Sequence, residues 1–454
     1  MTYDQFLAKK AIIDIPTGFN PIGKLPSQLF DFQIDCVRWA LRRGRAALFE
    51  DCGLGKSPQQ LAWAQQVLEK TNKPVLILAP NEVKKQTRRE GEKFGVEVIV
   101  CQENNQIQKS VNITNYERLH KFDVHQFGGI VLDESSILKS YDGATRDLII
   151  ESFCKTPYKL ACTATPAPND FMELGNHAEF LGVMSRVEML ATFFVHDGGD
   201  TSKWRIKRHA QQNFWKWLCS WAVNIRKPSD LGYSDDRFKL PKLNMFEHVV
   251  ESTQKMGGYL FPLPASSLHE RREARKESRT ERVEKAAEIA TKDDQCVFWC
   301  NLNTESELIA KELKAVEIRG STSEEEREEI AIGFLDGSIK RVVTKPSLWG
   351  FGMNLQCCHN TCLVGLSDSY EEFYQLIRRF YRFGQTKEVN AHVIISSLEG
   401  AVLLNIKRKE RDAKKLGDEM IKNMSDISSL EIKGTHKETI TYNPTQEIIL
   451  PNFI

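Results

Sequence analysis

The sequence predicts an α/β fold with two parallel-sheet domains in tandem and a helical insertion between them. Short apolar runs alternate with segments of helical periodicity, as buried parallel strands joined by helices do. This alternation occurs twice, over residues 30–175 and 286–400, and stops over residues 176–285. The other expected segments are a lead-in rich in proline and glycine at 1–29 and a basic helix with a polar tail at 401–454.

Size and composition exclude several classes of protein. The 454 residues provide for about three structural units, enough for more than one hydrophobic core. Charged residues are 27% and hydrophobic residues 41% of the chain, close to the averages for globular proteins, which excludes wholesale disorder. No apolar run approaches the roughly 18 residues of a membrane helix, and no leader-like apolar core is present. We therefore expect a cytoplasmic protein with reduced thiols and no membrane partner.

The first domain is expected to contain a phosphate-binding loop. A helix over residues 30–41 and a strand over residues 46–49 precede the run Glu50-Asp51-Cys52-Gly53-Leu54-Gly55-Lys56-Ser57, and another helix follows it. Such a glycine-rich turn directs backbone N–H groups at phosphate oxygens. Lys56 would reach the β- and γ-phosphates, and Ser57 would hold Mg²⁺. The alternative is a purely structural strand-to-helix turn.

Two carboxylates are expected at the same edge of the first sheet. Further buried strands are predicted at residues 74–80, 96–100, 111–114, 129–132 and 158–162. The fourth of these ends in Asp133 and Glu134, where parallel sheets carry their sites. Asp133 is interpreted as a residue that binds Mg²⁺ through the shell of ligands around the ion. Glu134 is interpreted as the group that accepts a proton from, or orients, the attacking water. The alternative for the pair is a solvated strand end. The last strand leads into a hydroxyl-rich turn with Thr163 and Thr165.

The insertion at residues 176–285 concentrates positive charge. A formal net charge of +1 excludes a protein that is basic all over. Residues 201–243 nevertheless hold ten Lys or Arg against three Asp, a local charge of +7. One helical face, which we interpret as core, is formed by Phe214, Trp217, Leu218 and Trp221. The basic excess is more typical of a surface that meets nucleic acid phosphates.

The second domain is expected to supply arginines to the first. Its strands are predicted at residues 295–299, 316–318, 341–344, 361–364 and 389–395, and its helices at 304–313 and 323–335. It has no phosphate-binding loop of its own. Arg379 and Arg382 are three residues apart and share a helix face if the helix persists that far, so both can point across an interdomain cleft. Arginines that reach a γ-phosphate from a neighbouring domain stabilise transition-state charge. A surface arginine cluster is the alternative.

Taken together, these motifs resemble those of the superfamily 2 helicases, and within them the SNF2-like DNA translocases, particularly the compact versions of phages and prophages. The run from Glu50 to Ser57 is similar to the family's Asp-Glu-x-Gly-Leu-Gly-Lys-Thr, which also lacks the first glycine of the loop. Asp133 and Glu134 match the start of Asp-Glu-Ala-His, whereas Ser135 and Ser136 depart from it. The ending Arg379-x-x-Arg382-x-Gly-Gln is the most family-specific part.

The resemblance implies two RecA-like domains that bind ATP and Mg²⁺ in the cleft between them. It assigns adenine recognition to Gln33, places Gln375 in the nucleotide site, and makes Arg379 and Arg382 catalytic. Contact with nucleic acid, or coupling to it, is implied for Asn115, Thr163, Thr165, Ser321, Thr344 and Asn354. The implied partner is DNA, held as a duplex mainly through its phosphates.

The implied activity is DNA-stimulated ATP hydrolysis coupled to movement along duplex DNA, in the cytoplasm of a bacterial cell, by a protein that the bacterium or a phage encodes. One alternative is an RNA helicase or a strand-separating helicase of the same superfamily. Another is a nucleotide-gated DNA-binding module that recruits replication or packaging proteins and has little turnover. The ATPase rate with duplex DNA, single-stranded DNA and RNA separates these hypotheses.

Overall fold

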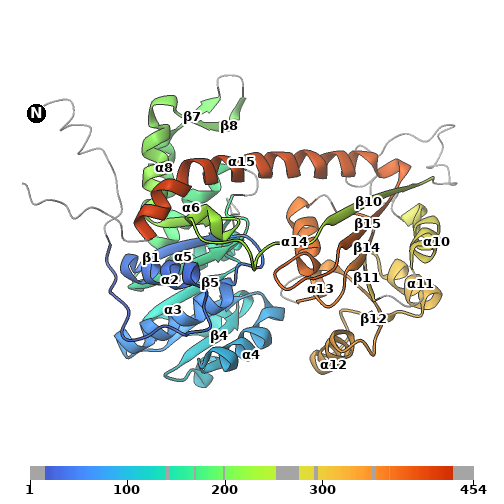
Figure 1. The fold of residues 1–454 in the computed structure, drawn as a ribbon, viewed down its shortest axis with the longest axis horizontal. Helices are drawn as coiled ribbons and strands as arrows, with labels where there is room; N and C mark the ends of the chain where they lie inside the picture. The colour runs from blue at the N-terminus through green and yellow to red at the C-terminus, as the bar shows by residue number, and fades with distance from the viewer. Residues whose placement is uncertain are drawn as a thin grey trace, which may run out of the picture.

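The structure is a computed structural model, and it describes residues 16–139, 143–167, 170–197, 200–251, 276–290, 295–349, 354–367 and 369–432. Two domains, each built on a parallel β-sheet, lie side by side, and the long C-terminal helix lies across both (Figure 1). The predicted α/β class with two parallel-sheet domains in tandem is therefore confirmed. Expectations for the two ends of the chain, at 1–15 and 433–454, fall outside the described residues. None of the described helices is both long and apolar enough to cross a membrane.

The first sheet has seven parallel strands in the order β3-β4-β2-β5-β6-β1-β9. Their bounds are Arg45–Glu50 (β1), Val75–Ala79 (β2), Val98–Val100 (β3), Val111–Asn115 (β4), Gly129–Asp133 (β5), Tyr158–Thr163 (β6) and Ala222–Ile225 (β9). Every apolar run that we interpreted as a strand of the first domain forms one. The runs are continuously apolar because helices cover both faces of a parallel sheet.

The helices of the first domain follow its strands in the expected alternation. Their bounds are Asp31–Arg43 (α2), Lys56–Thr71 (α3), Lys84–Phe94 (α4), Ala144–Ser152 (α5), Leu174–Leu181 (α6), Arg186–Phe193 (α7) and Gln211–Cys219 (α8). Short 3₁₀ helices lie at Asn81–Val83 (η1), Asn104–Gln106 (η2), Tyr116–Lys121 (η3), Val124–Gln126 (η4), Ser135–Lys139 (η5), Phe171–Glu173 (η6), Arg208–Ala210 (η7) and Pro228–Leu231 (η8).

The second sheet has six parallel strands in the order β10-β15-β14-β11-β13-β12. Their bounds are Leu243–Val250 (β10), Cys296–Cys300 (β11), Val316–Ile318 (β12), Arg341–Thr344 (β13), Asn360–Val364 (β14) and Val389–Ser396 (β15). The accompanying helices are Arg279–Ile289 (α10), Asn303–Leu313 (α11), Glu324–Leu335 (α12), Pro346–Trp349 (α13) and Tyr370–Phe380 (α14), and η9 covers Ser397–Glu399.

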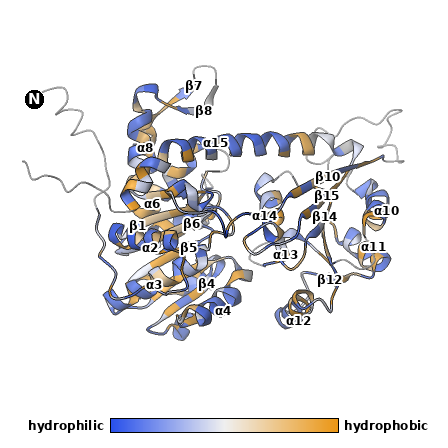
Figure 2. Ribbon diagram, in the orientation of Figure 1, coloured by the Kyte–Doolittle hydropathy of each residue, from blue (hydrophilic) through white to orange (hydrophobic). Residues whose placement is uncertain are grey.

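Each sheet separates two hydrophobic layers. In β1, Ala47 and Phe49 belong to one layer, whereas Ala46 and Leu48 belong to the other. This division follows from the strand geometry, because successive side chains point to opposite faces. Hydrophobic colour is accordingly concentrated on the strands, and the middle of the C-terminal helix is hydrophilic (Figure 2). Each domain therefore has its own core.

The segment at 176–285 differs from the helical insertion that we predicted. Besides α7 and α8 it contains an antiparallel hairpin, Phe194–Asp197 (β7) with Asp200–Ile206 (β8), which projects from the first domain in Figure 1. It also supplies β9 to the first sheet and β10 to the second. The polar interruptions around these short strands hide them from a search for long apolar runs. The segment thus contributes to both domains.

The aromatic face of this segment forms core, as predicted. Phe214, Trp217 and Trp221 are fully buried in the layer that α8 shares with the first sheet. Trp215, which does not share their helical face, is also buried, because it packs edge-on against Phe171 with 5.3 Å between ring centroids. Phe171 also contacts Phe214, so the same hydrophobic cluster extends around α8 to Trp215.

The C-terminal helix α15, Gly400–Ile432, connects the two domains along one side (Figure 1). At its start, Val402 and Ile406 are buried in the core of the second domain. Further along, Met420 and Met424 are buried in the core of the first domain. Near its end, Glu431 pairs with Arg43 at 2.6 Å. The helix is therefore part of both domains.

A buried ion cluster joins α10, α11 and η9, which directly precedes α15. The Arg282 guanidinium donates to Glu305 at 2.6 Å and to Glu399 at 2.8 Å, and all three side chains are almost fully buried. Glu399 also accepts the backbone N–H of Ser396 at 3.3 Å. The arginine therefore neutralises two carboxylates that have no access to water.

Arg282→Met is expected to lower the free energy of unfolding of the second domain by about 3–5 kcal/mol, because it leaves two buried carboxylates without their cation. The measurement is chemical denaturation followed by circular dichroism. Lys285→Met is the matched control, because Lys285 lies on the same helix in an exposed pair with Glu288, where a loss below about 1 kcal/mol is expected. Equal losses in the two variants would contradict the prediction.

Candidate active site

The predicted phosphate-binding loop lies between β1 and α3, at the carboxyl edge of the first sheet. Gly53 and Gly55 have φ angles of 92° and 80°, in the left-handed region that favours glycine. A Cβ at position 55 would lie 2.3 Å from Nε2 of Gln33, and a Cβ at position 53 would lie 2.8 Å from the backbone nitrogen of Phe383. The turn therefore requires glycine for its backbone conformation and for the close approach of its neighbours.

Lys56 is the first residue of α3 and Ser57 is the second. The Lys56 ammonium donates to the carbonyl oxygens of Glu50 at 2.8 Å and Asp51 at 3.3 Å. Burial favours a lower pKa for Lys56, but nearby acidic groups, including Cys52 and Glu134, raise its pKa above the usual value. The ammonium is thus held in its charged form at the start of the helix, where an anion binds most favourably.

The Asp133-Glu134 pair lies beside the loop, as the strand pattern predicts. β6 pairs with both β1 and β5, so the carboxyl ends of these three strands are neighbours. Asp133 accepts a hydrogen bond from Nε2 of Gln60 on α3 at 2.7 Å. Glu134 accepts one from Thr163 at the end of β6, at 3.4 Å. Side chains from α3 and β6 therefore hold the two carboxylates at the edge of the sheet.

The backbone of this pair is also held firmly. Glu134 has a φ of 55°, which is uncommon for a residue with a side chain. The buried hydroxyl of Tyr116 donates to the carbonyl oxygen of Asp133 at 2.6 Å. On the other side, the buried Ser135 hydroxyl lies 3.1 Å from Nε2 of His177. These contacts fix the turn that presents Glu134, and the sequence pattern did not reveal either Tyr116 or His177.

The charge distribution around Asp133 fits a magnesium ion. Burial raises the pKa of Asp133, and the neighbouring charge of Glu134 raises it further. A divalent cation relieves both effects, and carboxylate and hydroxyl oxygens are the ligands that Mg²⁺ prefers. Asp133, at the end of β5, and Ser57, on the helix that follows β1, would hold the ion. Both residues were predicted from the sequence.

The second domain brings its arginines to the loop. α14 ends at Phe380, so Arg379 is on the helix, whereas Arg382 lies in the turn beyond it. This corrects the expectation of a shared helix face: the helix does not persist to Arg382. The close approach of Phe383 to Gly53 nevertheless places Arg382 next to the loop. Burial lowers the pKa of Arg382, and repulsion from Arg379 lowers it further, as expected for clustered cations that an anion would stabilise.

The two glutamines assigned to the nucleotide site orient other groups. Nε2 of Gln33 donates to the carbonyl oxygen of Leu54 at 2.7 Å, and its Oε1 accepts the N–H of Phe30 at 2.9 Å. Gln375 accepts a hydrogen bond from Arg379 at 3.3 Å. Gln33 therefore supports the loop, and Gln375 orients an arginine. The direct contacts with adenine and nucleotide remain predictions.

The residues assigned to nucleic acid do not all reach the surface. Thr344 is fully buried, and its hydroxyl donates to Ile318 at 3.4 Å, which disagrees with a direct contact. Ser321 is exposed. Asn354 lines a cavity of about 320 Å³ between α4 and α12, and Lys84 of the first domain lines it too. Lys84 in turn donates to Asn115 at 3.4 Å.

The two threonines of the turn after β6 have different surroundings. Thr163 is buried, and its hydroxyl accepts the backbone N–H of Thr165 at 3.1 Å. Thr165 lines a cavity of about 470 Å³ between the first domain, α14 and α15, together with Asp51 and Arg378. Thr163 therefore contacts Glu134 of the carboxylate pair, while Thr165 faces the space between the domains. This arrangement suits a coupling role.

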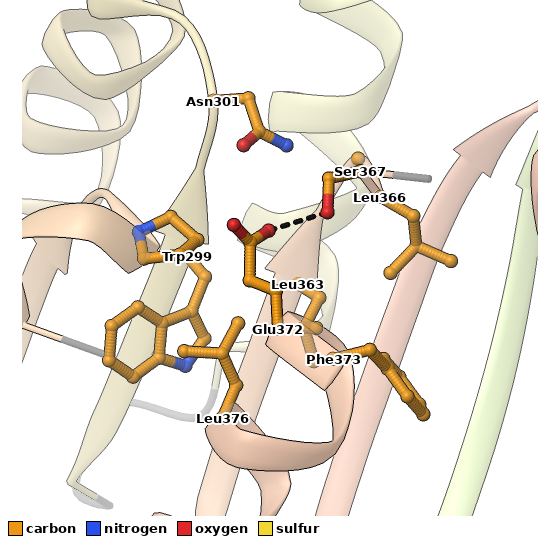
Figure 3. Close-up of a pocket in the computed structure, with 10 residues that line it drawn as sticks. Trp299, Asn301, Leu363, Leu366, Ser367, Glu372, Phe373 and Leu376 are labelled. Atoms are coloured by element: carbon orange, nitrogen blue, oxygen red, sulfur yellow. Dashed lines mark hydrogen bonds between the residues drawn. The ribbon is translucent and has the colours of Figure 1, made fainter. Parts of the chain in front are cut away.

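α14 is anchored within its own domain at its first turn. The Ser367 hydroxyl donates a hydrogen bond to the Glu372 carboxylate at 2.6 Å (Figure 3). Beside this bond is a cavity of about 10 Å³, large enough for roughly one water molecule. Ser369 caps the helix by accepting the N–H of Glu372 at 3.2 Å. Trp299 and Leu376 pack around the same cavity (Figure 3). These contacts fix the direction in which α14 presents its arginines.

Sequence reasoning missed three residues that join the domains at the loop. Asp51 of the loop contacts Tyr374 and Arg378 of α14. Arg378 stands next to Arg379 in the sequence, yet spacing alone singled out Arg379 and Arg382. An acidic residue in the loop and an extra arginine beside the motif were the only available signals.

Two protein-family profiles match the chain. The SNF2-related domain matches residues 32–193, and the helicase conserved C-terminal domain matches residues 280–384. Together these matches cover more than half of the 454 residues. No curated protein matches the chain. Among solved structures, the chain is similar to the Sulfolobus solfataricus SWI2/SNF2 ATPase core in complex with dsDNA, with a TM-score of 0.42 and 19% identity, over 91% of this chain and 97% of that chain.

Proposed function

The chain belongs to the SNF2-like superfamily 2 helicases, and from this membership we propose that it hydrolyses ATP to move along duplex DNA. The observation that carries the proposal is the meeting of three groups of residues at one edge of the first sheet. These are the Gly53–Ser57 loop, the Asp133-Glu134 pair and the arginines at the end of α14 and in the turn beyond it. A loop for phosphates, a carboxylate for water and arginines from a second domain are the parts that phosphoryl transfer requires.

In the proposed mechanism, Lys56 and the backbone N–H groups of the loop bind the β- and γ-phosphates of ATP. Mg²⁺, held by Ser57 and Asp133, would neutralise charge on the phosphates. Glu134 orients the attacking water and accepts its proton, and its turn is already fixed by Tyr116 and Thr163. Arg379 and Arg382 stabilise the charge that develops on the transferred phosphoryl group.

Movement would follow from opening and closing of the two domains. Turnover removes the γ-phosphate that attracts Arg379 and Arg382, so hydrolysis weakens one attraction between the domains. DNA that bridges both domains would then be gripped alternately by each. The exposed Ser321 and the cavity shared by Lys84 and Asn354 support contacts with DNA from both domains. Such contacts are mainly to phosphates and show little sequence preference.

The test is the steady-state ATPase rate with duplex DNA, single-stranded DNA and RNA, each at two salt concentrations. The proposal requires the largest stimulation with duplex DNA, and a stimulation that falls steeply with salt because phosphate contacts release counterions. Greater stimulation by RNA or single-stranded DNA would favour a helicase that acts on single strands. Nucleotide binding with negligible turnover under all conditions would favour the recruitment module.

A further inference from the structure

One face of α14 is in contact with the first domain. The helix lies on the side of the second domain that faces the first (Figure 1). Glu371, Tyr374 and Arg378 follow one another at intervals of three and four residues, which places them on the same side of a helix. Each contacts the first domain. We call these three residues the docking face.

The N-terminal end of the docking face contacts the segment that follows the Asp133-Glu134 pair. Glu371 forms an ion pair with Lys139, the last residue of η5. Lys139 lies five residues after Glu134, at the end of the short helix that begins with Ser135. This contact therefore ties α14 to the segment that carries the proposed base.

The C-terminal part of the docking face contacts the phosphate-binding loop. The Tyr374 hydroxyl donates to Oδ1 of Asp51 at 2.5 Å, and Arg378 forms an ion pair with the other carboxylate oxygen. Arg378 also donates to the carbonyl oxygen of Cys52 at 3.4 Å. Its guanidinium lies 5.6 Å from the centre of the Tyr374 ring and 5.7 Å from that of Tyr381.

The contact at Asp51 is largely buried and favours charged partners. Burial favours a higher pKa for Asp51, but the charge of Arg378 and the hydrogen bonds from Tyr374 and Arg378 lower its pKa overall. Burial likewise favours a lower pKa for Arg378, whereas Asp51 and Tyr374 raise it. Removing either partner of such a pair leaves the other charge without compensation.

We propose that the docking face positions the catalytic arginines through two contacts with the first domain. Glu371 contacts Lys139, and Tyr374 and Arg378 contact Asp51. This inference rests on the proposed function. Arg379 directly follows Arg378, and Arg382 lies only four residues beyond it. The two anchors in the first domain belong to the segments that carry Lys56 and Glu134. Docking therefore aligns the arginines with both parts of the site at once.

The order of charges makes this docking specific. The first domain offers a cation at Lys139 and an anion at Asp51, and α14 offers the opposite charges at matching positions. A shift of the helix by one turn would separate the oppositely charged partners and bring like charges closer together. Opposed charges across an interface fix its register in this way. Glu371, Tyr374 and Arg378 are positioning residues, since each acts through its neighbours.

The first test is a charge exchange at the end of the interface away from the loop. Glu371→Lys is expected to reduce DNA-stimulated kcat roughly 10-fold, because it faces Lys139 with a like charge. The double variant Lys139→Glu with Glu371→Lys restores opposite charges and should recover kcat to within about twofold of wild type. An unchanged kcat in the single variant, or no recovery in the double variant, would overturn the proposal.

The second test concerns the contact at Asp51. Arg378→Met should reduce kcat roughly 10- to 100-fold with little change in the affinity for a fluorescent ATP analogue, because it removes a charged contact between the domains and leaves Lys56 and the loop backbone in place. Asp51→Asn combined with Arg378→Met should add little to the single variants. Arg408→Met, in an exposed pair with Asp412 on α15, is the matched control and should retain wild-type kcat. Strictly additive effects would overturn the pairing.

A conformational measurement separates this proposal from the proposed function. Dyes placed one on each domain report the interdomain distance by energy transfer, without ATP turnover. Arg378→Met should broaden the distance distribution, and the exchanged Lys139/Glu371 pair should retain the wild-type distribution. An inactive wild-type protein whose distances still respond in this way would refute only the proposed function. An active wild-type protein whose distances and kcat ignore these substitutions would refute only the docking proposal.

Discussion

Arg382→Ala is expected to slow DNA-stimulated ATP turnover by about 10³- to 10⁵-fold, the range found when a transition-state arginine is removed. Arg382 lies in the turn after α14, where Phe383 packs against Gly53 of the phosphate-binding loop. Its charge is repelled by Arg379, so the arrangement favours an anion between the arginines and the loop. The effect should appear in kcat, because the strongest contact forms only as charge develops on the phosphoryl group.

Two measurements distinguish this role from a structural one. The affinity of Arg382→Ala for a fluorescent ATP analogue should change far less than kcat does. Arg382→Lys keeps the charge but loses the planar guanidinium, so it should recover only a small part of the lost rate. A variant with near-normal turnover would show that Arg382 is a surface cation, which is the alternative that the sequence left open.

Glu134→Gln is expected to reduce kcat by about 10²- to 10⁴-fold while ATP still binds, because the amide cannot accept the proton of the attacking water. The substitution preserves the size of the side chain at a position where φ is 55°. The amide can still form a hydrogen bond with Thr163, so the fold should be unaffected. Single-turnover hydrolysis and equilibrium nucleotide binding measure the two effects separately.

The matched control for this prediction is Glu69→Gln on α3, an exposed position that pairs only with neighbouring glutamines among the described contacts. It removes the same charge from the same domain and should leave kcat unchanged. Hydrolysis by Glu134→Gln at a rate close to wild type would remove the assignment of the base. Loss of ATP binding in that variant would instead point to a structural role for Glu134.

The residues that meet at the candidate site could largely be located from residue patterns. Continuous apolar runs correctly predicted the strands that carry the loop and the Asp133-Glu134 pair, because strands covered on both faces need no polar alternation. Once the strands are parallel, their carboxyl ends meet at one edge, and Lys56 lies near Glu134 without further information. The spacing of Arg379 and Arg382 singled out the part of the second domain that lies next to the loop.

Other features depend on where chain segments end and what they meet. β9 is a four-residue strand in a polar segment, and its place beside β1 comes from pairing, which a short pattern does not reveal. The end of α14 at Phe380 moves Arg382 off the helix face that spacing predicted. Thr344 matches a contact motif, but the sheet buries it completely. In each case a tertiary neighbour overrides the local pattern.

The sequence by itself determined the fold class and the chemical groups that make up the candidate site. Strand burial, the glycine-rich turn and the carboxylate pair are local properties of the chain. Only the tertiary structure decided how the second domain docks. Asp51 and Arg378 are 327 residues apart in the sequence, and no local pattern relates them. Their contact exists because α14 approaches the loop with the opposite charge on the facing side, and that approach depends on the packing of both whole domains.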